Sequence, residues 1–133
     1  MKKAVNNIII NQGGKILIIK RTVRKEKAYP GLWDLPGGGV EEGETLQETA
    51  KREAMEEVSL EIKPVQDCFY VYHYEDKDLY VYGMISETNS ASVTLSEAHT
   101  EFKWISKDEY KNFEYTLSVT ATIEEFFNKN EQY

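Results

Sequence analysis

Apolar residues gather in short runs along the chain, and the spacing within most of these runs predicts β-strands. Residues 4–11 and 15–21 are rich in isoleucine, and the glycine pair between them is typical of a hairpin turn. Tyr70, Tyr72 and Tyr74 alternate with other residues, as they do when every second side chain faces one side of a sheet. Further strands are predicted over residues 31–35, 61–75, 79–87 and 99–105, with a break in the chain at residues 36–39.

Two segments have the spacing of helices instead. Thr45 followed by Glu48 forms a capping box, which predicts that a helix begins at about Leu46. A second helix is predicted over residues 117–128. Apolar residues recur at every fourth position of the first helix, as on the packed side of a helix: Leu46, Ala50, Ala54 and Val58.

The order of these elements, β-β-(β)-α-β-β-β-α, predicts an α/β fold. The expected architecture is an α/β/α sandwich around a mixed β-sheet. The alternative is an α+β layer that carries both helices on one face of the sheet. A length of 133 residues suits a single domain over residues 1–133.

The charge of the chain narrows the classes of function. The net charge is −7, from 23 acidic and 16 basic residues, which counts against a nucleic acid polymer as partner. A phosphate substrate would need a cation between it and so acidic a protein. A single cysteine, Cys68, excludes an internal disulfide. The sequence has no evident signal peptide or membrane span, so the expected location is the cytoplasm.

Three glutamates on the first helix are the candidate chemistry. Glu53, Glu56 and Glu57 stand at positions i, i+3 and i+4, and they project within an arc of roughly 100°. Like charges this close destabilise a bare helix, and a hard divalent cation with oxygen ligands, such as Mg²⁺, would offset the repulsion. The glycines at 37–39 allow backbone to approach a ligand closely just before this helix. The alternatives are a solvated acidic helix face and a plain tight turn.

The segment over residues 38–60, GGVEEGETLQETAKREAMEEVSL, resembles the Nudix box, G-x5-E-x7-R-E-U-x-E-E-x-G-U with U a bulky aliphatic residue. Leu60 fills the last aliphatic position, whereas Ala54 is smaller than the usual residue and Ser59 stands in place of a glycine. A serine there is expected to strain the helix end, where glycine supplies a left-handed cap. The stretches over 33–38 and 101–104 are similar to those of MutT-like members. Six residues occupy the other defined positions: Gly38, Glu44, Arg52, Glu53, Glu56 and Glu57.

This resemblance implies a nucleotide pyrophosphatase, a hydrolase that cleaves a nucleoside diphosphate linked to another group X with Mg²⁺ or Mn²⁺ as cofactor. Carried over by position, Glu53 is a metal ligand or the base that activates water, while Arg52 and Glu44 orient the carboxylates. The implied metal ligands are Glu53, Glu56, Glu57 and the carbonyl of Gly37.

Substrate contacts are expected from Gly38 and from Arg21, which would receive the distal phosphates. The alternative for Arg21 and its basic neighbours is a solvated loop. The same basic cluster includes Arg24, Lys25 and Lys27. Some members of the family draw a further carboxylate from outside the box, for which Glu101 and Glu97 are the candidates. Spacing does not choose between them, and the alternative for each is a surface carboxylate. The leading substrate is a small nucleotide, a (deoxy)nucleoside triphosphate cleaved to monophosphate and pyrophosphate. The alternatives are a nucleotide sugar, a dinucleoside polyphosphate, or a Nudix fold that senses a nucleotide without cutting it.

Overall fold

The structure is a computed structural model that describes residues 1–23 and 31–129. Its centre is a sheet in the order β3-β2-β1-β6-β5, in which β4 also pairs with β1 and β7 with β2. β1 runs parallel to β6 and antiparallel to β2 and β4, so the sheet is mixed. The strands are β1 (Lys2–Ile10), β2 (Ile16–Arg21), β3 (Trp33–Asp34), β4 (Gly37–Gly39), β5 (Lys63–Tyr74), β6 (Leu79–Glu87) and β7 (His99–Ile105).

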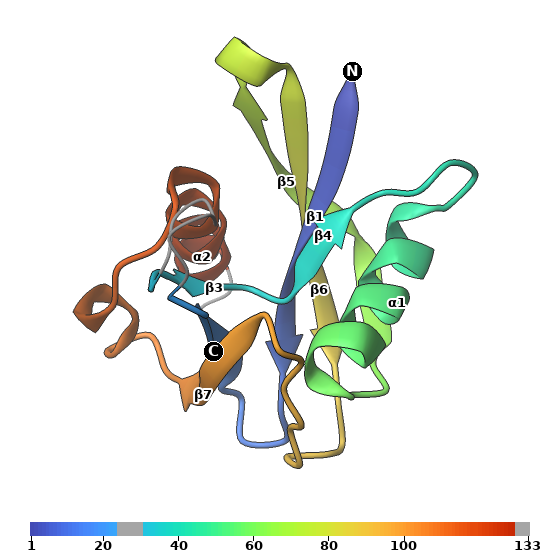
Figure 1. Ribbon diagram of the computed structural model, residues 1–133. Helices are drawn as coiled ribbons and strands as arrows, with labels where there is room; N and C mark the ends of the chain where they lie inside the picture. The colour runs from blue at the N-terminus through green and yellow to red at the C-terminus, as the bar shows by residue number, and fades with distance from the viewer. Residues whose placement is uncertain (24–30, 130–133) are drawn as a thin grey trace.

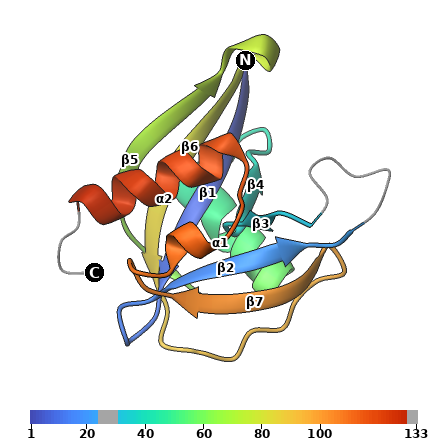
Figure 2. The same cartoon turned by 90° about the vertical axis from the view of Figure 1, so that its left-hand side faces the viewer.

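Helix α1 (Leu46–Val58) covers one face of the sheet and α2 (Leu117–Lys129) covers the other (Figures 1 and 2). β1 contributes side chains to the core on both faces of the sheet, because neighbouring side chains of a strand point to opposite faces. Ile8 and Ile10 pack in the core beneath α2, whereas Val5 and Ile9 pack beneath α1. The predicted α/β/α sandwich around a mixed sheet is confirmed. No helix in the described part of the chain is long and apolar enough to cross a membrane.

The longer helices and strands begin and end within two residues of their predicted bounds. The predicted break at residues 36–39 is wrong for its three glycines, 37–39. These glycines form β4, which pairs antiparallel with residues 4–6 of β1. The absence of a side chain makes the pairing possible, since a Cβ on Gly37 would lie 1.9 Å from the carbonyl oxygen of Val5. β4 thereby fixes the start of the following loop against the sheet. Short 3-10 turns at Glu75–Lys77 and Tyr110–Asn112 complete the described elements.

The ends of α1 form as the sequence predicts. Thr45 caps the start, with both hydrogen bonds of the capping box to Glu48 present. Ser59 follows the last turn in the left-handed conformation, with φ 57° and ψ 36°. A side chain is disfavoured in this region, which glycine occupies without steric cost.

We expect Ser59→Gly to raise the free energy of unfolding by about 0.5–1 kcal/mol, because it removes the Cβ from a left-handed position. The gain is reduced by loss of the hydrogen bond from Ser59 Oγ to the carbonyl oxygen of Thr94, 3.2 Å long. Urea unfolding measures the change. Ser59→Ala is the control: it loses the hydroxyl but keeps the strain, so it should be no more stable than wild type. A glycine variant less stable than the alanine variant would contradict the assignment.

A buried histidine on β7 predicts acid sensitivity. His99 is 7% exposed, and its Nδ1 has no hydrogen-bond partner among the described residues. Burial, and secondarily the charge of Arg21, lowers the pKa of His99 to about 4. Its contribution to stability is therefore complete above the unfolded pKa of about 6.5 and is lost as the pH falls toward 4. Between pH 8 and pH 5 we expect wild type to lose about 2 kcal/mol more than His99→Gln. Equal losses in urea unfolding would refute this.

Candidate active site

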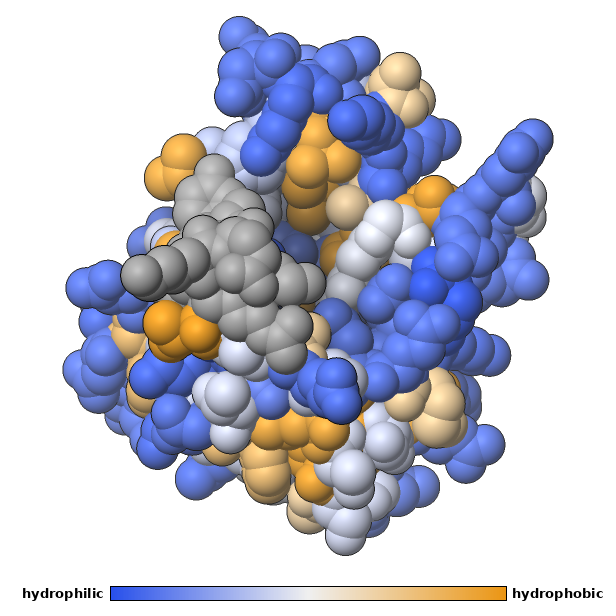
Figure 3. All heavy atoms as spheres, viewed as in Figure 1, coloured by the Kyte–Doolittle hydropathy of each residue, from blue (hydrophilic) through white to orange (hydrophobic). Residues whose placement is uncertain are grey.

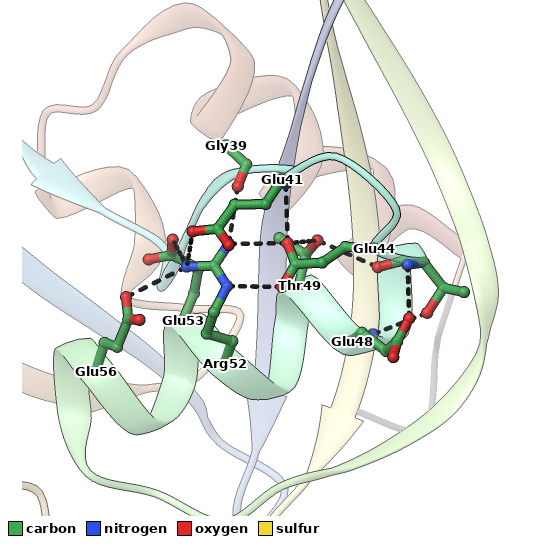
Figure 4. Close-up of polar contacts among 9 residues, drawn as sticks. Gly39, Glu41, Glu44, Glu48, Thr49, Arg52, Glu53 and Glu56 are labelled. Carbon is green, nitrogen blue, oxygen red and sulfur yellow. Dashed lines mark hydrogen bonds and ion pairs between the residues drawn. The ribbon is translucent and has the colours of Figure 1, made fainter.

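Arg52 lies between Glu44, Glu53 and Glu56, three of the carboxylates that the sequence singled out (Figure 4). It holds Glu44 with two hydrogen bonds, Nε to Oε2 at 2.7 Å and Nη2 to Oε1 at 2.9 Å. Nη1 reaches Glu53 Oε1 at 2.8 Å and Glu56 Oε2 at 3.3 Å, and Nη2 also donates to the carbonyl oxygen of Gly39 at 3.0 Å. One guanidinium therefore ties the loop after β4 to two glutamates of α1.

Glu44 fixes the loop as well as the arginine. Besides Arg52, its Oε1 accepts hydrogen bonds from the hydroxyl of Thr49 and from the backbone N–H of Glu41, each 2.9 Å long. The hydrogen bonds from Arg52 hold the pKa of Glu44 down at about 2. A carboxylate that stays ionised and fully partnered is able to hold Arg52 and the loop in place.

Glu53 packs directly against the backbone of β4. Its side chain is 14% exposed, and burial raises the pKa of its carboxyl group, opposed by Arg52. A Cβ on Gly38 would lie 2.7 Å from both Cδ and Oε1 of Glu53. The glycine at this box position therefore makes room for the carboxylate.

We expect Gly38→Ala to lower kcat about 10- to 100-fold while the fold survives, because the added methyl group pushes away the end of a side chain rather than backbone. Gly39→Ala is the matched control, since a Cβ there meets no atom within 4 Å. Steady-state kinetics and thermal unfolding of both variants measure the effect. Equal activities of the two variants would show that the position of Glu53 is unimportant.

Glu57 lies deeper, one turn further along α1. Its Oε1 accepts the backbone N–H of Gly37 at 2.8 Å. Burial raises the pKa of Glu57 to about 8, and the negative charge of Asp34 adds to the rise. The carbonyl of Gly37 was expected to serve as a metal ligand, whereas the contact that the structure shows for this residue is made through its N–H. Burial therefore disfavours the charged form of Glu57. The hydrogen bond from Gly37 holds its carboxyl group in one orientation.

Asp34 is a carboxylate of the site that the sequence analysis did not single out. Its Oδ2 accepts a hydrogen bond from Arg21 Nε at 3.0 Å and forms an ion pair with Arg21 Nη2 at 2.9 Å. Its side chain is 14% exposed, and burial raises its pKa against the effect of Arg21. Arg21 is therefore held beside Asp34 and Glu57. The remaining members of its predicted cluster, Arg24, Lys25 and Lys27, lie outside the described residues.

The two outer glutamates are placed differently. Glu101 on β7 forms an ion pair with Lys20 of β2 at 3.4 Å and is half-exposed, apart from the carboxylates bound by Arg52. Glu97 follows Ser96, whose backbone N–H donates to the carbonyl oxygen of Glu57 at 3.0 Å. The chain next to Glu97 is therefore attached to the end of α1, and Glu97 is the better placed candidate for an additional carboxylate.

A hollow of about 270 Å³ opens beside this cluster, on the face shown in Figure 3. Its wall includes the first halves of β1 and β6, the start of β4, the end of β5, and the first turn of α2. Arg21, Asp34, Gly37 and Gly38 line it on the side of the carboxylates. The volume is close to the lower bound, about 300 Å³, of pockets that hold small molecules. Sequence spacing gave no sign of this hollow, because distant segments form it.

The donor set fits a hard divalent cation, because carboxylate oxygens are the ligands such ions prefer. The raised pKa values of Glu53 and Glu57 mark buried carboxyl groups that lack sufficient positive charge nearby. In the part of the chain that the structure describes, no three acidic, histidine or cysteine side chains already surround a common metal position. Arg52 Nη1 instead bridges Glu53 and Glu56, so cation binding requires these two side chains to turn.

Known proteins resemble this chain in both sequence and fold. A family model described as NUDIX domain matches residues 1–125. The nucleoside triphosphatase NudI of Enterobacter sp. (strain 638) is 30% identical over 127 residues, covering 86% of this chain and 89% of that protein. The crystal structure of a MutT protein from Methanosarcina mazei Go1 superposes with a TM-score of 0.78 at 28% identity, covering 97% of this chain and 94% of that one. A C. elegans Ap4A hydrolase, 22% identical, shares the fold with a TM-score of 0.77 and full coverage of both chains. The chain belongs to the Nudix hydrolase family.

Proposed function

We propose that this Nudix hydrolase cleaves a (deoxy)nucleoside triphosphate to the monophosphate and pyrophosphate, with Mg²⁺ or Mn²⁺ as cofactor. The observation that carries the proposal is the position of Gly38. Its backbone lines the hollow, and its Cα faces the carboxylate of Glu53. A nucleoside in the hollow therefore extends its phosphates past β4 toward the glutamates. The NudI relative, described as a nucleoside triphosphatase, supports the same substrate class.

Glu53, Glu56 and Glu57 would hold the metal, which would neutralise phosphate charge and make a nearby water more acidic. The net charge of −7 makes such a cation necessary for a polyphosphate to approach. The carboxylate of Glu53, held beside Gly38, accepts a proton from the attacking water. Arg52 and Glu44 hold the loop after β4 against α1. Arg21 faces the phosphates from the side of Asp34.

The test is a panel of nucleotides incubated with the full chain, with Mg²⁺ and with a chelator. The panel includes nucleoside triphosphates and deoxynucleoside triphosphates, ADP-ribose, a nucleotide sugar and a dinucleoside polyphosphate. Phosphorus NMR should show monophosphate and pyrophosphate from a triphosphate, and no product when the metal is removed. Preferred turnover of another class would contradict the substrate, and nucleotide binding without turnover would indicate a sensor.

A further inference from the structure

Asn6 on β1 places a polar side chain in the wall of the hollow, between apolar residues of the sheet and polar residues of α2. It is 8% exposed, and Ala4, Leu79 and Val81 line the hollow beside it. Its Nδ2 donates to Ser118 Oγ at 3.3 Å and to Thr122 Oγ1 at 3.5 Å, both on α2. A buried amide requires partners for its oxygen as well as its nitrogen.

The orientation of this amide is fixed by α2. The hydroxyl of Thr122 donates its proton to the carbonyl oxygen of Ser118 at 2.7 Å, so Thr122 Oγ1 can only accept from Asn6. The nitrogen of Asn6 therefore faces α2, which turns Oδ1 away from the helix. Among residues 1–23 and 31–129, no N–H or O–H group donates a hydrogen bond to Oδ1. Oδ1 is also not completely enclosed by protein atoms. It remains an acceptor open to the hollow.

We propose that Asn6 selects nucleotides whose base carries an exocyclic amino group, as in cytosine and adenine. The proposal rests on the function proposed above. The exocyclic group projects furthest from the ring of a base, so it is the group that meets a recessed acceptor. An amino group there donates to Oδ1, whereas the keto oxygen of uracil or hypoxanthine places two acceptors face to face.

The same contacts oppose rotation of the amide to suit a keto base. A turn of 180° would place Oδ1 against Thr122 Oγ1, whose proton is already engaged. Tyr74 keeps the arrangement rigid, because its hydroxyl accepts the backbone N–H of Ser118 at 2.9 Å and joins β5 to the first turn of α2. Unpaired buried polar groups are a strong source of discrimination between analogues.

The test compares kcat/KM within nucleotide pairs that exchange this amino group for a keto oxygen and gain a proton on the adjacent ring nitrogen, CTP with UTP and ATP with ITP. We expect wild type to favour the amino member of at least one pair about 10- to 100-fold. Asn6→Leu should bring that ratio near one. Thr122→Val should also lower it, because the amide is then free to rotate. Thr120→Val on the same helix is the control and should keep the wild-type ratio.

Thermal unfolding checks that each variant folds, and the wild-type ratios need no variant at all. Turnover with no amino preference in either pair would overturn the role of Asn6, and so would an unchanged ratio in folded Asn6→Leu. Absence of turnover for every nucleotide would overturn the proposed function instead. In that case, calorimetric affinities for the same pairs decide on Asn6: a preference for the amino member supports the proposal, and equal affinities refute it.

Discussion

Glu57→Gln is expected to lower kcat on the order of 10³-fold, because the amide cannot supply a charged oxygen to a divalent cation. The amide oxygen can still accept the N–H of Gly37, so the fold has little reason to change. Glu61→Gln is the control, since Glu61 is an exposed glutamate beyond the end of α1. Metal-dependent kinetics with the preferred triphosphate measure the effect. Retention of a tenth of the activity would remove Glu57 from the set of metal ligands.

The same variant should lower activity without lowering stability at high pH. Because the pKa of Glu57 is raised to about 8, the folded metal-free protein favours the protonated side chain. That contribution to stability is complete below the unfolded pKa, about 4.3, and is lost as the pH rises through 8. At pH 9 without metal, Glu57→Gln should therefore be at least as stable as wild type in urea unfolding. A joint loss of activity and stability would indicate a structural role instead.

Gly37→Ala is expected to destabilise the protein by more than about 3 kcal/mol. Its Cβ would lie 1.9 Å from the oxygen and 2.9 Å from the carbon of the Val5 carbonyl group, so β4 would have to separate from β1. That movement also takes the N–H of Gly37 away from Glu57. The midpoint of thermal unfolding should fall by about 10 °C. Gly39→Ala on the same strand should leave it within about 2 °C, and an equal fall for both variants would contradict the steric argument.

Much of the carboxylate cluster was predictable because it is local in sequence. The capping box of Thr45 and Glu48 begins α1, and helical spacing then brings Arg52 and Glu56 to the same side. The loop from Gly39 to Glu44 connects directly to this helix, so its contacts with Arg52 span few residues. Contacts within one helix and the loop before it involve residues that are close in sequence. Their pattern can therefore be read from the sequence itself.

The hollow and its polar wall depended on tertiary structure alone. β1 pairs parallel with β6, more than seventy positions away, and no periodicity within either strand specifies its partner. That pairing and the packing of α2 bring Asn6 to Thr122, 116 positions apart in sequence. Asp34 acts on the pKa of Glu57 because β3 and β4, which follow each other closely along the chain, pair with the neighbouring strands β2 and β1.

The sequence by itself determined the helix, its caps and the order of charged side chains along it, since these follow from residues within one or two turns. Only the tertiary structure decided that three glycines form a strand, because glycine has weak strand propensity and β4 exists through its partner β1. It also decided which distant side chains share the hollow with the glutamates. Contacts across the sheet depend on how whole strands and helices pack, and that information is spread over the entire chain.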